Sequence, residues 1–380
     1  MKILVAMDSF KESLTALEAC DAVEQGIKEV NPDIEVIKRP VADGGEGTVE
    51  TLIDALNGEK ISLEIRDPLM REIDGIYGIF NEETAIIESA ISCGLTLLSE
   101  KEKNPLFTTT YGVGEIIKNA LDKGIRDFII GIGGSCTNDA GIGMLSVLGM
   151  KFYDKDNNLL EPIGNSLNLI ERIDVTEFDE RIKESKFLIA SDVNNPLFGP
   201  NGAAYIYSPQ KGANEIIVKE LDQGLENFSK IVTELLNIDY SQAPGAGAAG
   251  GLGYTFLTFF NAQLKPGVNI IFDRLNLDEL ASESNYIITG EGKIDKQSAM
   301  GKVLSGIGAL GLKYKIPVIA IAGIVDESAN KLHEIGITSM FSIINKPIEH
   351  YEAINKDNSK AMLKNCVIEI VKLLNFNNKN

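Results

Sequence analysis

The sequence predicts an α/β fold in which parallel β-strands alternate with helices that cover the sheet. Near the N-terminus, an apolar run at residues 3–6 predicts a strand. Apolar residues at helical spacing follow from Leu14 to Ile27, and a second short strand is predicted at 34–37. Strand, helix and strand in this order form a βαβ unit, so the two strands should lie parallel in one sheet. The same alternation returns near the C-terminus. The 380 residues, 44% of them hydrophobic, are enough for two or three domain cores.

The remaining elements follow from the same periodicities. Towards the C-terminus, strands are predicted at 286–288, 317–322 and 340–344, and helices at 301–313, 327–335 and 360–374. The middle of the chain begins differently, with three short runs that predict an antiparallel meander at 61–66, 73–80 and 84–87. It continues with helices at 114–122, 140–148 and 216–236, and with strands at 128–132 and 187–190.

This order of elements predicts two different α/β domains. Residues 1–57 and 285–380 should form a discontinuous domain with a parallel sheet. Residues 58–284 should form a mixed α/β domain inserted between its two halves. Segment 127–150 could supply a strand to either sheet, so its placement stays open.

Charge and cysteine spacing exclude several classes of protein. The 36 basic and 55 acidic residues give a net charge of −19, which disfavours nucleic acid and anionic membranes as partners. The longest uncharged apolar run, 316–325, is about half of what crosses a bilayer. The apolar N-terminal stretch is cut by Asp8 and is too short for a secretory signal, so we expect a cytoplasmic protein. The four cysteines show no CxxC spacing, which argues against disulfides or a zinc cluster.

Two glycine-rich segments are candidate anion-binding loops. Segment 42–48 follows a strand and opens a helix, so its N–H groups could hold an anion, or Asp43 and Thr48 could only cap the helix. Segment 131–141 follows the strand at 128–130, at the strand end where α/β sheets place ligands. Its glycines would let phosphate oxygens approach the main chain.

Segment 131–141 also carries polar side chains that can act on a ligand. Ser135 and Thr137 can add hydrogen-bond donors to a phosphate site. Asp139 could bind a metal or take a proton, or it could cap the next helix. We favour phosphate binding by this segment because several side chains that can donate hydrogen bonds or act on a ligand lie close together in it.

Two further glycine-rich segments differ in what they predict. Segment 244–251 matches GxGxxG formally, but no strand precedes it, so nicotinamide dinucleotide binding is weakly supported. Its small residues would let a nucleotide or a partner helix come close. Segment 289–295 reads as a turn after the strand at 286–288, and its two carboxylates and lysine fit Mg²⁺ and phosphate, or else a solvated ion pair.

Polar residues follow other predicted strands in the same way. Asp8, Ser9 and Lys11 come at the end of the first strand, and Asp192 follows the strand at 187–190. Asp192 is a candidate base and Lys211 a candidate anion anchor, although each alone is more typical of a turn or a solvated surface. Together these strand ends have the composition of a phosphoryl-transfer site, in which positioning and charge neutralisation do most of the work.

Seven of these motifs, in their order along nearly the whole chain, resemble the type 1 glycerate kinases of bacteria. They are Met7 to Lys11, Ala42 to Thr48, Gly133 to Gly141, Ser191 to Leu197, Pro209 to Ala213, Pro244 to Gly251 and Gly290 to Asp295. One departure is Glu12, because the family usually has glycine there, in the stretch DSFKGSL.

The resemblance implies a kinase that depends on ATP and Mg²⁺ and phosphorylates D-glycerate. It implies a discontinuous Rossmann-like domain and a second α/β domain, with the active site between them. The expected product is 2-phosphoglycerate, with 3-phosphoglycerate as the alternative. The expected protein is a monomer or a small homo-oligomer.

Charge suggests a role for each candidate residue. The proposed catalytic residues are Asp192 as base, Asp139 as its rival, and Lys293, which neutralises the transferring phosphoryl group. The proposed substrate-binding residues are Asp8, Ser9, Lys11, Asp43, Gly44, Gly45 and Glu46. The proposed nucleotide- or phosphate-binding residues are Gly133, Gly134, Ser135, Thr137, Gly245, Gly247 and Gly290. The proposed Mg²⁺ ligands are Glu291 and Asp295.

Two other functions remain open from the residues alone. A dehydrogenase of hydroxy acids would use the GxGxxG that begins at Gly245, and would bind a nicotinamide cofactor. A non-catalytic sensor of sugar acids or nucleotides would keep a ligand crevice without turnover.

Overall fold

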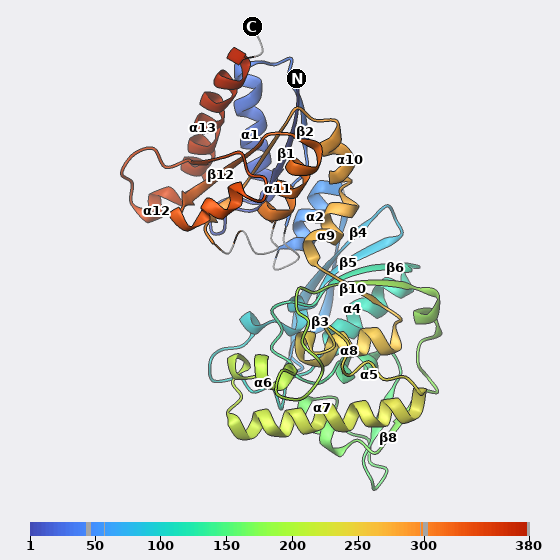
Figure 1. Cartoon of the computed structure of the whole chain (residues 1–380). Coiled ribbons are helices and arrows are strands. Elements are labelled where there is room, and N and C mark those ends of the chain that lie inside the picture. The colour runs from blue at the N-terminus through green and yellow to red at the C-terminus, as the bar shows by residue number, and fades with distance from the viewer. Residues whose placement is uncertain (43–46, 57, 297, 299–302, 378–380) are drawn as a thin grey trace. The chain divides into compact units, whose positions relative to one another are not determined.

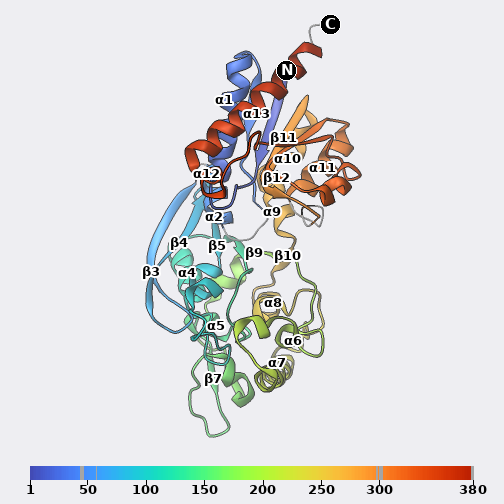
Figure 2. The ribbon, with the colours of Figure 1, turned by 90° about the vertical axis from the view of Figure 1, so that its left-hand side faces the viewer.

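The chain divides into two compact units. The computed structural model describes residues 1–42, 47–56, 58–296, 298 and 303–377 (Figures 1 and 2). Unit 1 comprises Met1–Asp43, Glu50–Asn57 and Val268–Asn380, and unit 2 comprises Gly44–Val49 and Gly58–Gly267. Each unit has its own sheet and helices, so the predicted fold class is confirmed.

Unit 1 is built on a five-stranded parallel sheet with the order β13-β12-β11-β1-β2. Its strands are β1 (Lys2–Met7), β2 (Glu35–Lys38), β11 (Tyr286–Ile294), β12 (Val318–Val325) and β13 (Ser339–Ser342). Residues 3–7 of β1 have no exposed surface. A strand paired on both edges and covered on both faces must be apolar throughout, which is why this run is continuous rather than alternating. Both ends of the chain therefore meet in one sheet, blue and orange-red in Figure 1.

The helices of unit 1 pack on this sheet. Helix α1 (Ala16–Val30) begins with a capping box formed by Thr15 and Glu18, and it lies beside α13 (Lys356–Asn377) in Figures 1 and 2. Gly26 allows this packing, because a Cβ there would lie 2.9 Å from the Lys364 carbonyl oxygen. The others are α9 (Gly267–Arg274), α10 (Leu277–Ser282), α11 (Val303–Tyr314), the 3₁₀ helix η5 (Glu327–His333) and α12 (His350–Ala353). Helix α2 (Thr48–Leu56) begins in unit 2 and ends in unit 1.

The turn predicted at 289–295 is wrong, because strand β11 continues to Ile294. Its partners on both edges account for this: β1 pairs with its first half, and β12 pairs with it as far as Ile294 and Val325. Pairing with β12, together with β1 as far as Gly290, outweighs the low strand preference of glycine. Gly290 itself is required by packing, since a Cβ there would lie 1.9 Å from the Ile321 carbonyl oxygen.

Unit 2 is built on a six-stranded mixed sheet with the order β10-β9-β6-β5-β4-β3. Its strands are β3 (Glu59–Arg66), β4 (Glu72–Phe80), β5 (Thr84–Glu88), β6 (Asp127–Gly131), β9 (Lys186–Ala190) and β10 (Gln263–Lys265). Strands β3, β4 and β5 are antiparallel, which confirms the predicted meander, and β5, β6, β9 and β10 are parallel. Segment 127–150, whose placement the sequence left open, lies in this unit.

Short helices and one long helix surround the sheet of unit 2. They are α3 (Ala90–Cys93), η1 (Leu95–Leu97), α4 (Tyr111–Asp122), α5 (Ile142–Val147), η2 (Gly164–Leu169), η3 (Glu180–Glu184), α6 (Ala203–Tyr207), η4 (Pro209–Lys211), α7 (Glu215–Leu236) and α8 (Ala248–Phe259). A small antiparallel pair, β7 (Lys151–Tyr153) and β8 (Arg172–Asp174), stands apart from the main sheet. Phe128 and Phe187 face each other across β6 and β9 and stack at 4.6 Å between ring centroids, which anchors the core.

Candidate functional site

A cavity of about 400 Å³ lies in unit 1 at the carboxyl ends of its central strands. Strands β1 and β11 run parallel with Met7 opposite Gly290, and the Asp8 N–H donates to the Gly290 carbonyl at 2.9 Å. The residues that follow the two strands are therefore brought together. The cavity lining includes six predicted site residues, namely Asp8, Ser9, Lys11, Glu291, Lys293 and Asp295.

The cavity of unit 1 carries both cations and carboxylates. The Lys293 ammonium lies 3.3 Å from the Asp295 carboxylate, and its side chain is 57% exposed. Lys11 is also exposed. An ion pair this open to water contributes little to stability. The two lysines are instead accessible to a small anion that enters the cavity.

Glu12, also in the lining of this cavity, lies in a strained turn. Its φ is +67°, in the left-handed region, and the turn is closed by two hydrogen bonds between the backbones of Phe10 and Leu14. Glycine reaches this conformation at little cost, whereas a residue with a Cβ does not. The geometry therefore explains why glycine is usual at this position in the family that the sequence resembles.

Replacing Glu12 by glycine is expected to raise the free energy of unfolding by up to about 1 kcal/mol, because it relieves the left-handed strain. Urea denaturation of the two proteins measures this. Glu12→Ala is the matched control, since it removes the carboxylate but keeps the Cβ. Equal stabilisation by Glu12→Ala would contradict the explanation and point to charge instead.

A second group of predicted residues lies at the carboxyl ends of the parallel strands of unit 2. Within this group, Gly133 and Gly134 are exposed, and a Cβ at Gly133 would meet no atom within 4 Å. Ser135 and Thr137, by contrast, are 5% and 0% exposed. The surface that this loop offers to a ligand is thus mainly glycine backbone.

Lys211 lies beneath this loop and is 2% exposed. Its ammonium donates to Ser135 Oγ at 3.0 Å and to the Thr137 carbonyl at 2.7 Å. Burial lowers the pKa of Lys211 to about 8. The lysine therefore supports the loop from inside rather than from solvent.

Asp139 holds two helix starts together and has no exposed surface. Its carboxylate accepts hydrogen bonds from the backbone N–H of Thr110 at 2.8 Å, of Gly141 at 3.1 Å and of Gly143 at 3.2 Å, and from Thr110 Oγ1 at 2.8 Å. Burial raises the pKa of Asp139, and these four donors oppose the rise. The geometry supports the capping alternative, so we withdraw Asp139 as a candidate base or metal ligand.

Asp192 follows β9 and is exposed, as a base that meets a substrate must be. The N–H of Gly267, which follows the neighbouring strand β10, donates to Asp192 Oδ1 at 3.2 Å. This contact orients the carboxylate at the strand edge. Of the two candidate bases, Asp192 is the one with the required access to solvent.

The glycines at 245 and 247 are explained by packing. A Cβ at Gly247 would lie 2.2 Å from the Pro196 carbonyl oxygen, and one at Gly245 would lie 2.6 Å from the Leu264 side chain. The element before them is helix α7, not a strand. The GxGxxG therefore lacks the context of a dinucleotide fingerprint, as the sequence indicated.

Glu88 was not predicted as part of the site. It is 7% exposed at the end of β5, and its carboxylate accepts from the N–H of Val49 at 2.7 Å and of Gly47 at 3.4 Å. A carboxylate at a helix start is favoured by the unpaired N–H groups and the helix dipole. Glu88 thus fastens the start of α2. The only indication of it in the sequence was an acidic residue at the end of a buried strand.

The predicted residues Asp43, Gly44, Gly45 and Glu46 lie outside the described residues.

Two carboxylates of the unit 1 cavity suit a magnesium ion. Glu291 lies in β11 and accepts a hydrogen bond from Ser298 Oγ, and Asp295 directly follows this strand. All these donors are oxygens, and Mg²⁺ takes one or two carboxylates together with substrate phosphates. Among the described residues no cluster of three or more acidic, histidine or cysteine side chains could hold a metal alone. A metal here would need oxygens from its substrate as well.

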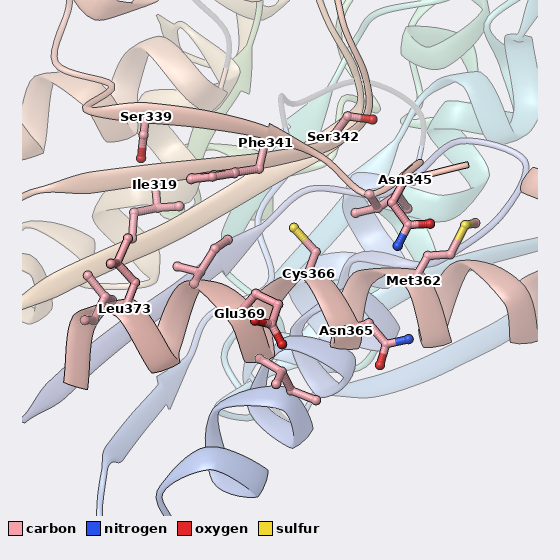
Figure 3. A pocket seen from close by; sticks show the side chains of 14 residues that line it. Ile319, Ser339, Phe341, Ser342, Asn345, Met362, Asn365, Cys366, Glu369 and Leu373 are labelled. Carbon is pink, nitrogen blue, oxygen red and sulfur yellow. The ribbon is translucent and has the colours of Figure 1, made fainter. Parts of the chain in front are cut away.

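A second cavity of unit 1, about 540 Å³, lies between α13 and strands β12 and β13 (Figure 3). Met362 and Cys366 of α13 line it, together with Phe341 of β13. No predicted site residue belongs to its lining, so we assign it no part in the reaction.

In the described part of the chain, no helix combines the length and the apolar character that a membrane crossing needs.

Comparison with known proteins agrees with this geometry. The family model of the glycerate kinases matches residues 3–375. A glycerate kinase of Bacillus cereus is 43% identical over 96% of this chain and 97% of its own length. The glycerate 2-kinase of Escherichia coli is 44% identical over 90% of this chain and 91% of its own. A crystal structure from Salmonella typhimurium, provisionally described as glycerate kinase 2, matches all of both chains with a TM-score of 0.91 and 36% identity.

These matches define an enzyme of the phosphotransferase class that uses an alcohol as acceptor. More narrowly, the chain belongs to the glycerate kinase family.

Proposed function

We propose that the protein transfers the terminal phosphoryl group of ATP to a hydroxyl of D-glycerate, with Mg²⁺, and forms 2-phosphoglycerate. The observation that carries this proposal is the match to the glycerate kinase family over residues 3–375. The Escherichia coli relative is named a glycerate 2-kinase, which supports the 2-hydroxyl as the acceptor.

The cavity of unit 1 supplies the charges that this reaction needs. Lys11 binds the glycerate carboxylate, and Lys293 neutralises charge on the transferring phosphoryl group. Both lysines line one cavity and are exposed, which supports these roles. Glu291 and Asp295 would hold Mg²⁺, which when bound supplies further positive charge beside the phosphates.

Unit 2 carries the candidate phosphate loop 133–135 and the candidate base Asp192. The exposed backbone of Gly133 and Gly134 receives a phosphate group of the nucleotide, because glycine lets an anion approach the N–H groups closely. Asp192 accepts the proton of the substrate hydroxyl. In phosphoryl transfer this proton leaves late, so a carboxylate of ordinary strength is sufficient as base.

The test is a kinase assay with ATP, Mg²⁺ and D-glycerate, followed by ³¹P NMR of the product. We expect ADP only when glycerate is present, and the phosphorus signal of 2-phosphoglycerate. A 3-phosphoglycerate signal would correct the acceptor hydroxyl alone. ADP formation that does not depend on glycerate, or none at all, would overturn the function and favour a ligand sensor. A fluorescence titration with NADH tests the dehydrogenase alternative, for which we expect no binding.

A further inference from the structure

Helix η4 ends in a lysine that is held inside unit 2. Lys211 is the last residue of η4, and Gly212 after it has φ +97° and packs against the backbone of Lys103. Just before η4, Ser208 Oγ donates to Asn138 Oδ1 at 3.0 Å. These contacts fasten η4 to the segment that follows the exposed glycine loop. The ammonium of Lys211 is thereby placed behind that loop.

The hydrogen bonds of Lys211 join it to both ends of a short stretch. One acceptor is Ser135 Oγ, directly after Gly134, and the other is the Thr137 carbonyl. Lysine has three N–H donors, and within the described part of the chain only these two acceptors contact them. The Lys211 side chain therefore fixes the position of the residues that directly follow Gly134.

The charge of Lys211 has no carboxylate in contact with it. Among the described residues, its ammonium forms no ion pair with a carboxylate within 4.0 Å, and its two contacts are a hydroxyl and a carbonyl. The titratable groups that face it are Cys93 of α3, Cys136 of the same loop and Asp139. Burial raises the pKa of both thiols, so they stay neutral, and the carboxylate of Asp139 already has four donors of its own. A buried cation without a paired anion is costly, and an anion that binds nearby offsets that cost.

We propose that Lys211 is a positioning residue of the phosphate site. It holds the loop 133–135 in the conformation that exposes the backbone of Gly133 and Gly134. Its charge favours a nucleotide phosphate that binds to this exposed backbone. The inference rests on the proposed function, since it takes ATP as the ligand of this loop. It also changes the role expected from the sequence, in which Lys211 touched the anion itself. Lys211 acts through Ser135 and Thr137, from a position that solvent does not reach.

The experiment compares Lys211→Met with the wild type and with Lys219→Met, an exposed lysine of α7 in the same unit. Methionine keeps the unbranched shape and most of the length of the side chain, and removes its charge and donors. At pH 7 we expect Lys211→Met to lower kcat/KM for ATP by at least about tenfold, and Lys219→Met to leave it unchanged. Circular dichroism shows whether each variant is folded.

A pH profile separates this role from simple packing. Burial lowers the pKa of Lys211 to about 8, so kcat/KM for ATP in the wild type should fall as the pH rises through that value. The fall should be absent in Lys211→Met, which has no charge to lose, and absent also in Lys211→Arg, because arginine stays protonated. If Lys211→Met does not fold, the affinity of the wild type for ATP at pH 7 and pH 9 decides, and equal affinities overturn the proposal.

The two proposals fail differently. A wild type that does not phosphorylate D-glycerate overturns the proposed function. A wild type that does, together with a folded Lys211→Met that keeps kcat/KM for ATP and the pH profile within twofold, overturns the role of Lys211 and leaves the function intact.

Discussion

Asp192→Asn should lower kcat by about a hundredfold or more, which is the usual contribution of a general base. Asparagine keeps an oxygen that can accept the hydrogen bond from the Gly267 N–H, so the local backbone is preserved while the base is lost. The KM for glycerate should change little, because the carboxylate acts on the proton in the transition state. Steady-state kinetics at saturating ATP measures both quantities.

Asp156→Asn is the matched control, since Asp156 is an exposed aspartate of the same unit. We expect it to keep the turnover of the wild type. Near-normal turnover of Asp192→Asn would show that another group receives the proton.

Lys293→Ala should reduce kcat by about a hundredfold while it changes the KM for glycerate only a few-fold. The reason is that negative charge spreads over the transferring phosphoryl group in the transition state, where a positioned ammonium acts most strongly. The ion pair of Lys293 with Asp295 is exposed, so its loss should cost little stability. Kinetics with glycerate and ATP varied in turn separates the two effects.

Lys331→Ala, an exposed lysine on η5 of the same unit, controls for a general loss of positive charge. It should behave as the wild type. The opposite pattern for Lys293→Ala, with kcat kept and the KM for glycerate strongly raised, would mean that Lys293 binds the carboxylate of the acid.

Much of the architecture could be predicted because its signals are local. The runs at 61–66, 73–80 and 84–87 have the period of strands and are joined by turn residues, and they form the antiparallel part of the unit 2 sheet. Strand ends also bring candidate site residues together within unit 1, where Asp8 and Lys293 line the same cavity. Parallel strands place their carboxyl ends on one edge, which requires no knowledge of packing.

Features that depend on contacts with distant parts of the chain were predicted less well. The segment at 289–295 looks like a turn by composition, yet it completes a strand because β12 pairs with it as far as Ile294, while β1 pairs with it only up to Gly290. Glu88 carried only a weak signal, since its partners at Gly47 and Val49 lie far from it in the sequence. Such contacts are set by tertiary structure, and no local pattern contains them.

The strands of the two main sheets, with the exception of β10, and the candidate phosphate-binding residues followed from the amino-acid sequence, because periodicity and side-chain chemistry are properties of short segments. Burial was decided only by folding. Ser135, Thr137 and Asp139 share one polar loop with Gly133 and Gly134. In the fold, however, the start of α4 donates to the Asp139 carboxylate, and Lys211 of η4 donates to Ser135 Oγ and to the Thr137 carbonyl. Those contacts give the buried side chains of Ser135 and Asp139 hydrogen-bond partners within the protein, as polar groups removed from solvent require, and the glycine backbone stays exposed.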